Sequence, residues 1–131
     1  MYSDTVIELT IIIIIIYITV PLTVTIIPAG DANVVDLTEG ETETFTCITC
    51  ASRPASWMHW YIDRQNVTNQ AATEPPQQDE DNFISASSLV YTGRDVDHKK
   101  VIFCDTVNIE GRQKVKSTEK SLYIQCKYYL P

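Results

Sequence analysis

The strongest constraint on the fold comes from two cysteines and a tryptophan that lie inside separate β-prone segments. Cys47 lies in TETFTCIT, Trp60 in WMHWYID and Cys104 in VIFCDTV. Twelve residues separate Cys47 from Trp60, and 43 separate Trp60 from Cys104. The chain also contains Cys50 and Cys126, and four cysteines allow three complete pairings, among which the sequence alone does not decide. The pairing therefore has to be considered together with the strand pattern.

Short β-prone runs separated by turn signals extend from residue 21 to residue 124, and no helical period is evident. In one of these runs the alternation places Phe45 and Cys47 on the same face of a strand. The predicted strands are Leu22–Ile27, Asn33–Leu37, Thr42–Thr49, Trp57–Asp63, Ser87–Thr92, Val101–Val107 and Val115–Gln125. Seven or so short strands with turns between them predict a two-sheet sandwich.

Two connections between these strands have distinct signals. Asn69–Asn82 is polar and acidic and has too little apolar content to be buried, so we expect an irregular, mobile loop there. Glu110-Gly111 is the expected hairpin turn before the last strand.

The composition bounds the class of protein. At 131 residues the chain has room for one domain plus a leader or linker, and 44% hydrophobic with 21% charged residues excludes a wholly disordered chain. The net charge of −7 argues against a nucleic-acid partner.

No residue pattern indicates catalysis, a cofactor or a metal site. Cys47-Ile48-Thr49-Cys50 has the CxxC spacing, but it ends a strand, whereas a redox pair favours a helix N-terminus and a zinc site needs a second close ligand pair. His59 and His98 are the only histidines, and neither has an evident nucleophile as a partner. We expect His98, in a charged loop, to be solvated.

The N-terminal stretch allows three interpretations. Leu9–Ile18 has the apolar character of a secretory signal, but Asp4 and Glu8 replace the expected basic start. Residues 9–27 are also long enough for a membrane-spanning helix. The third interpretation is a β-branched strand, or a start codon misplaced in simple-sequence DNA.

Five segments together resemble a known family. They are PLTVTII, LTEGETETFTC, SRPASWMHWYID, SSLVYTGRDVDHKKVIFC and SLYIQCKYYLP. Over residues 21–131 the chain resembles the C2-type immunoglobulin domains of nectin- and nephrin-like adhesion receptors and of invertebrate surface proteins built from them. Two features depart from the wider pattern: Ile102 replaces the tyrosine found two residues before the second cysteine in other immunoglobulin sets, and Cys50 and Cys126 are additional.

The resemblance implies an all-β, immunoglobulin-like, antiparallel Greek-key sandwich of two sheets, preceded by a hydrophobic N-terminal segment. It also implies a Cys47–Cys104 disulfide between the sheets, with Trp60 in the core against it, and hence an oxidising, extracellular compartment. In that fold Cys50 and Cys126 lie too far apart to bond. We expect a leader over residues 1–20, the domain over 21–126, and over 127–131 a linker to a following domain.

One modification site and one binding face follow from the strand pattern. Asn66 begins the only N-glycosylation sequon, which is modified if the chain is secreted. If Trp60 and Cys104 point inward, alternation sends a set of rings outward on one sheet. They are Trp57, His59, Tyr61, Phe103 and Tyr123. Such a surface fits either partner binding or cross-strand stiffening, and in the resembling receptors this face commonly carries adhesive contacts.

These expectations combine into a non-catalytic binding module of a cell-surface adhesion or recognition protein. It would bind a protein partner, homophilic or heterophilic, through the C–F–G sheet. The alternative is a secreted immune-type protein that recognises non-self ligands or glycans. Membrane attachment through residues 9–27, or through a region beyond the C-terminal end of this sequence, stays open.

Overall fold

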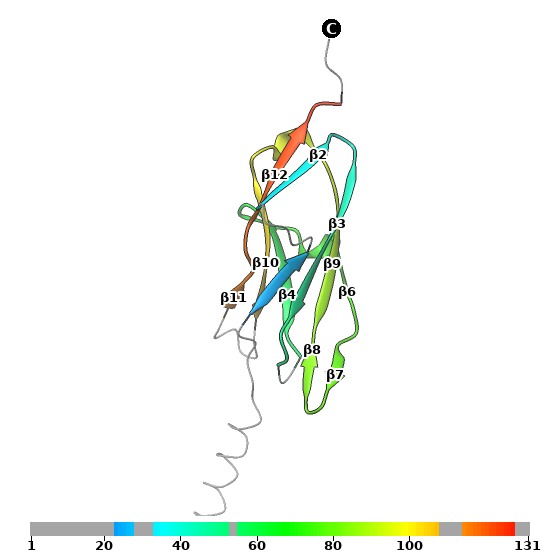
Figure 1. Cartoon of the computed structure of the whole chain (residues 1–131), viewed down its shortest axis with the longest axis vertical. Coiled ribbons are helices and arrows are strands. Elements are labelled where there is room, and N and C mark those ends of the chain that lie inside the picture. The colour runs from blue at the N-terminus through cyan, green and yellow to red at the C-terminus, as the bar shows by residue number, and fades with distance from the viewer. Residues whose placement is uncertain (1–22, 28–32, 53–54, 108–113, 128–131) are drawn as a thin grey trace, which may run out of the picture.

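A computed structural model describes residues 23–27, 33–52, 55–107 and 114–127 as two β-sheets packed face to face (Figure 1). The first sheet contains, in spatial order, β1 (Val24–Ile27), β3 (Thr42–Thr49), β9 (Ala86–Thr92) and β6 (Ala71–Thr73). The second contains β2 (Val34–Thr38), β12 (Lys120–Gln125), β10 (Val101–Val107), β4 (Trp57–Ile62) and β5 (Gln65–Asn66), and β11 (Lys114–Lys116) pairs with β10. We call them the β3–β9 sheet and the β4–β10 sheet. The predicted two-sheet sandwich is confirmed.

The remaining regular elements are short. A separate hairpin joins β7 (Gln77–Asp79) to β8 (Asn82–Ile84). The 3₁₀ helices are η1 (Thr68–Gln70) and η2 (Asp95–Asp97). No helix within the described residues has the length and hydrophobicity needed to cross a bilayer. The N-terminal run of isoleucines and the Glu110-Gly111 turn lie outside the described residues.

Strand alternation produces the core between the sheets. In β3, Phe45 and Cys47 are fully buried, whereas Thr46 and Ile48 between and beyond them are half-buried. The same alternation in β4 buries Trp60 completely. Burying one large apolar side chain stabilises a fold by about 1.5–3 kcal/mol. The most deeply buried hydrophobic residues are Ile26, Phe45, Cys47, Trp60, Leu89, Ile102, Cys104 and Leu122.

The edge strand β2 pairs differently from the others. It runs parallel to β12 and pairs Leu37 with Ile124, both of which point into the core. The other strand pairings that the structure describes are antiparallel. The N-terminal part of the domain therefore contributes one edge strand, β1, to the first sheet and another, β2, to the second.

Two expectations about connections are wrong. Asn69–Asn82 is not irregular: it contains β6, β7 and the start of β8, which pair with neighbouring strands through backbone hydrogen bonds. Ser52 and Phe83 also exchange backbone hydrogen bonds, which tie this hairpin to the segment before β4. The predicted strand Val115–Gln125 is two strands, interrupted where the Ser117 hydroxyl accepts a hydrogen bond from the Cys104 amide at 3.0 Å.

Tyr91, at the end of β9, gives the fold a pH-dependent contact. Its hydroxyl is buried and donates a hydrogen bond of 2.8 Å to Asp97 in η2. Burial, together with this bond to a carboxylate, raises the pKa of Tyr91 from 10.0 to about 12.

We expect this contact to weaken in alkali. The folded chain keeps a proton that the unfolded chain loses above pH 10.0, so the contribution is fully present below that pH and disappears as pH rises to about 12. A pKa difference of this size corresponds to about 2–3 kcal/mol. Tyr91→Phe should therefore lose less stability between these pH values than the wild-type chain, as measured by urea unfolding with exposed thiols alkylated. An equally steep decline in both proteins would contradict this assignment.

Candidate binding face

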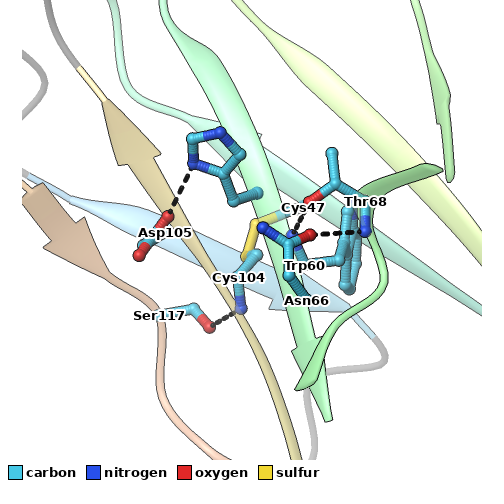
Figure 2. Close-up of polar contacts among 8 residues, drawn as sticks. Cys47, Trp60, Asn66, Thr68, Cys104, Asp105 and Ser117 are labelled. Atoms are coloured by element: carbon cyan, nitrogen blue, oxygen red, sulfur yellow. Dashed lines mark hydrogen bonds and ion pairs between the residues drawn. A yellow bond between two sulfur atoms is a disulfide. The ribbon is translucent and has the colours of Figure 1, made fainter. Parts of the chain in front are cut away.

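The disulfide and Trp60 fix which way the strands of the β4–β10 sheet face. Cys47 in β3 is bonded to Cys104 in β10, with their Cα atoms 6.6 Å apart. Trp60 is the cross-strand partner of Cys104, and its indole N–H donates to the Ser87 hydroxyl of the opposite sheet at 3.0 Å. Figure 2 shows the disulfide close to Trp60. Since these groups point into the core, their immediate neighbours along β4 and β10 point to solvent.

The outward positions of β4 and β10 hold a cluster of rings. Phe103 lies directly opposite Tyr61, and the two rings stack with centroids 5.2 Å apart and planes 15° apart. His59 meets the Tyr61 ring edge-on at 6.5 Å. These three side chains are half-buried. Aromatic pairs of this kind add about 0.5–1.5 kcal/mol beyond their area burial, so the cluster also stiffens the sheet.

Trp57 is the outlier among these rings. It begins β4, two positions before His59 on the same face, and 77% of its surface is exposed. Trp57 extends the row of rings on this face, and a contiguous exposed apolar patch of this kind is typical of interaction surfaces. We define the aromatic patch as Trp57, His59, Tyr61 and Phe103.

Charged groups border the aromatic patch. The Asp105 carboxylate lies 3.5 Å from His59 Nδ1, and Asp105 is largely buried. Lys116, in β11, places its ammonium 4.1 Å from the centre of the Phe103 ring and also pairs with Glu119. Lys116 could not be assigned to this face from the sequence, because its contact with Phe103 depends on the pairing of β11 with β10.

Tyr123 lies apart from the patch. The register between β10 and β12 pairs Val101 with Ser121, so Tyr123 is offset from Phe103 by four residues, about 13 Å along the sheet. Its ring instead contacts His98 edge-on at 5.5 Å. His98 is exposed, as expected, but it is not solvated alone: its Nδ1 accepts a hydrogen bond from the Ile124 amide at 3.0 Å.

Asn66 sits at the β5 edge of the same outer face. It is the cross-strand partner of Tyr61, and the next residue, Val67, is buried in the core. Alternation therefore turns Asn66 outward, and the side chain is exposed. Its Oδ1 accepts the Thr68 amide at 2.9 Å, and the Thr68 hydroxyl accepts the Trp60 amide at 2.9 Å (Figure 2).

The two remaining cysteines lie at opposite ends of the sandwich. Cys50 follows the end of β3, whereas Cys126 follows Gln125, which pairs with Thr38 before β3 begins. Neither belongs to a disulfide. Within the described ranges, no group of three or more His, Cys, Asp or Glu side chains is arranged to hold a metal ion.

Comparison with known proteins supplies a family and a fold. The family model for the CD80-like C2-set immunoglobulin domain matches residues 29–114. The crystal structure of Rst D1-D2 superposes with a TM-score of 0.70 at 18% identity, covering 82% of this chain and 51% of that one. The full ectodomain (Ig1–Ig3) of mouse nectin-like molecule 4 superposes with a TM-score of 0.62 at 19% identity, covering 83% and 35%.

At 18% and 19% sequence identity, these likenesses establish the fold alone. This chain spans about half of the length of the first structure's chain and about a third of the second's. No curated protein matches the chain in sequence.

Proposed function

The chain belongs to the CD80-like C2-set immunoglobulin domain family, and from this membership we propose that it is a non-catalytic, extracellular binding module of a cell-surface adhesion or recognition protein. The binding domain spans residues 21–126, and the protein partner docks on the outer face of the β4–β10 sheet. The mechanism is surface burial between folded partners, with no bond made or broken.

The observation that carries this proposal is the exposure of Trp57. The Trp57 indole is 77% exposed and offers a large apolar area to a partner. The stacked rings beside it are already held in place, so little side-chain entropy is lost when a partner orders this face. Tryptophan is also among the residues most enriched at interface hot spots. Lys116 and Glu119 at the border supply the polar rim that such interfaces have.

Substitution of Trp57 by serine tests the face. We expect Trp57→Ser to weaken binding about ten-fold or more, as a hot-spot residue does, while changing the free energy of unfolding by about 0.5 kcal/mol or less. The measurement uses beads coated with the full chain. Bead–bead clustering reports binding to a second copy, and adhesion of the beads to cells reports a different partner.

Val90 provides the matched control. It is 63% exposed on β9 and so belongs to the outer side of the other sheet. Val90→Ser should leave clustering and cell adhesion unchanged. Equal loss with both variants, or wild-type adhesion with Trp57→Ser, would contradict the proposal. If adhesion to cells disappears when their surface glycans are removed, the alternative of a secreted glycan-recognition protein is favoured instead.

A further inference from the structure

We propose that Asn66 carries an N-linked glycan that stands on the same face as the aromatic patch, covers its Tyr61 end, and leaves its Trp57 end open to the partner. The statement that a partner docks at the Trp57 end rests on the proposed function. The position of the glycan does not, and it is tested separately below.

The local structure presents Asn66 as an acceptor. Asn66-Val67-Thr68 is a sequon, and Asn66 is exposed at the end of β5. Its contact with the Thr68 amide uses the carbonyl oxygen. Nδ2, the atom that bears an N-linked sugar, donates no hydrogen bond within the described part of the chain. The tight turn between β4 and β5, in which Asp63 has a φ of 51°, projects this short hairpin edge into solvent.

The chemistry requires a co-reactant of one class, an oligosaccharide linked to a lipid diphosphate. Asn66 Nδ2 forms a bond to the anomeric carbon of the first sugar, and the bond from that carbon to the diphosphate oxygen breaks. Nδ2 loses one proton, and the lipid diphosphate leaves. No electron is transferred to or from the protein.

The strand register fixes where the sugar stands. Directly opposed residues of an antiparallel pair have Cβ atoms about 4.5–5.5 Å apart on the same face, so a sugar on Asn66 lies beside the Tyr61 ring. Trp57 lies four residues away along β4, about 13 Å from Tyr61. The first sugar therefore reaches Tyr61 and not Trp57.

This placement narrows the docking surface. A partner that lies flat over the whole sheet would collide with the glycan at the β5 edge. The uncovered area runs from Trp57 over His59 to the Lys116 side of β10, and the partner has to approach from there.

Mass spectrometry and oxidative footprinting test the placement without any partner. The full chain is directed through the secretory pathway of a eukaryotic cell, and glycosylation is mapped on peptides. Hydroxyl-radical oxidation of Tyr61 is then compared before and after enzymatic glycan removal, which converts Asn66 to aspartate in the folded protein. Because a sugar at the opposed position covers part of the ring, we expect roughly two-fold slower oxidation of Tyr61 with the glycan present, and unchanged oxidation of Trp57 and Tyr123.

Two variants serve as controls. Asn66→Asp keeps an oxygen for the Thr68 amide but removes the acceptor, so it should match the deglycosylated protein. Thr68→Ser keeps both the sequon and the hydroxyl that accepts the Trp60 amide, so it should match the wild-type chain. An unmodified Asn66, or a glycan that leaves Tyr61 oxidation unchanged, would overturn the inference. If footprinting succeeds but Trp57→Ser binds normally, the proposed binding face fails and the glycan position stands.

Discussion

Replacing Cys47 and Cys104 together by alanine is expected to lower the free energy of unfolding by about 4 kcal/mol, because the disulfide closes a long loop in the unfolded chain. The two residues are 57 positions apart in the sequence, so the unfolded chain gains much freedom without the bond. Domains of ordinary size unfold with only about 5–15 kcal/mol. The variant should therefore be close to the limit of folding at body temperature. Urea unfolding monitored by circular dichroism measures the difference.

Cys126→Ser is the control for this prediction. Cys126 is exposed and belongs to no disulfide, so its replacement should change stability by about 0.5 kcal/mol or less. A double Cys47/Cys104 variant with wild-type stability would mean that the bond between the sheets is absent from the folded protein.

Trp60→Ala is expected to cost about 3–5 kcal/mol, the range for removing a large aromatic side chain from a packed core. The indole is completely buried, and its N–H is bonded to Ser87 of the opposite sheet. The substitution leaves a cavity beside the disulfide and removes a hydrogen bond between the two sheets. The measurement is again urea unfolding, with the disulfide kept intact.

Trp57→Ala is a closely matched comparison, because it changes the same residue type in the same strand. Trp57 is 77% exposed whereas Trp60 is fully buried, so the loss of stability at Trp57 should be about 0.5 kcal/mol or less. Comparable losses at both positions would show that Trp57 packs against the domain rather than standing open.

Much of the core was predictable because alternation in a strand depends on the sequence alone. The positions of Phe45 and Cys47 on one face of β3 are confirmed by their burial. The strands β6, β7 and β8 were not predictable, because each has only three residues, too few to show an apolar alternation, and they pair through the backbone. A segment rich in acidic and amide side chains can form strands wherever an adjacent edge offers partners.

Which side chains group together on the candidate face was less predictable than which side chains point outward. Which side chains point outward follows from parity along each strand, but their grouping depends on the register between strands. Tyr123 shares the outward parity of Phe103, yet the β10–β12 register separates them and brings Tyr123 to His98. Lys116 contacts the Phe103 ring only because β11 pairs with β10. β11 ends at Lys116, where the chain breaks from β12 at Ser117, and the sequence does not signal this break.

The rings of the candidate face differ in how closely they pack against one another. Tyr61 and Phe103 stack closely enough to stiffen the sheet, so replacing either ring would change the stability of the domain as well as any binding. Trp57 has no such contact with another ring in the described part of the chain, and it begins a strand whose next ring is two positions on. Binding experiments are therefore cleanest at Trp57.

Oxidative footprinting of the bound chain tests the central claim most directly. Trp57 and Val90 are both exposed in the isolated domain, on the outer sides of opposite sheets. In clustered beads or in beads attached to cells, we predict that Trp57 is protected from oxidation relative to dispersed beads and that Val90 is not. Protection of Val90 with Trp57 still reactive would place the partner on the β3–β9 sheet and contradict binding through the β4–β10 face.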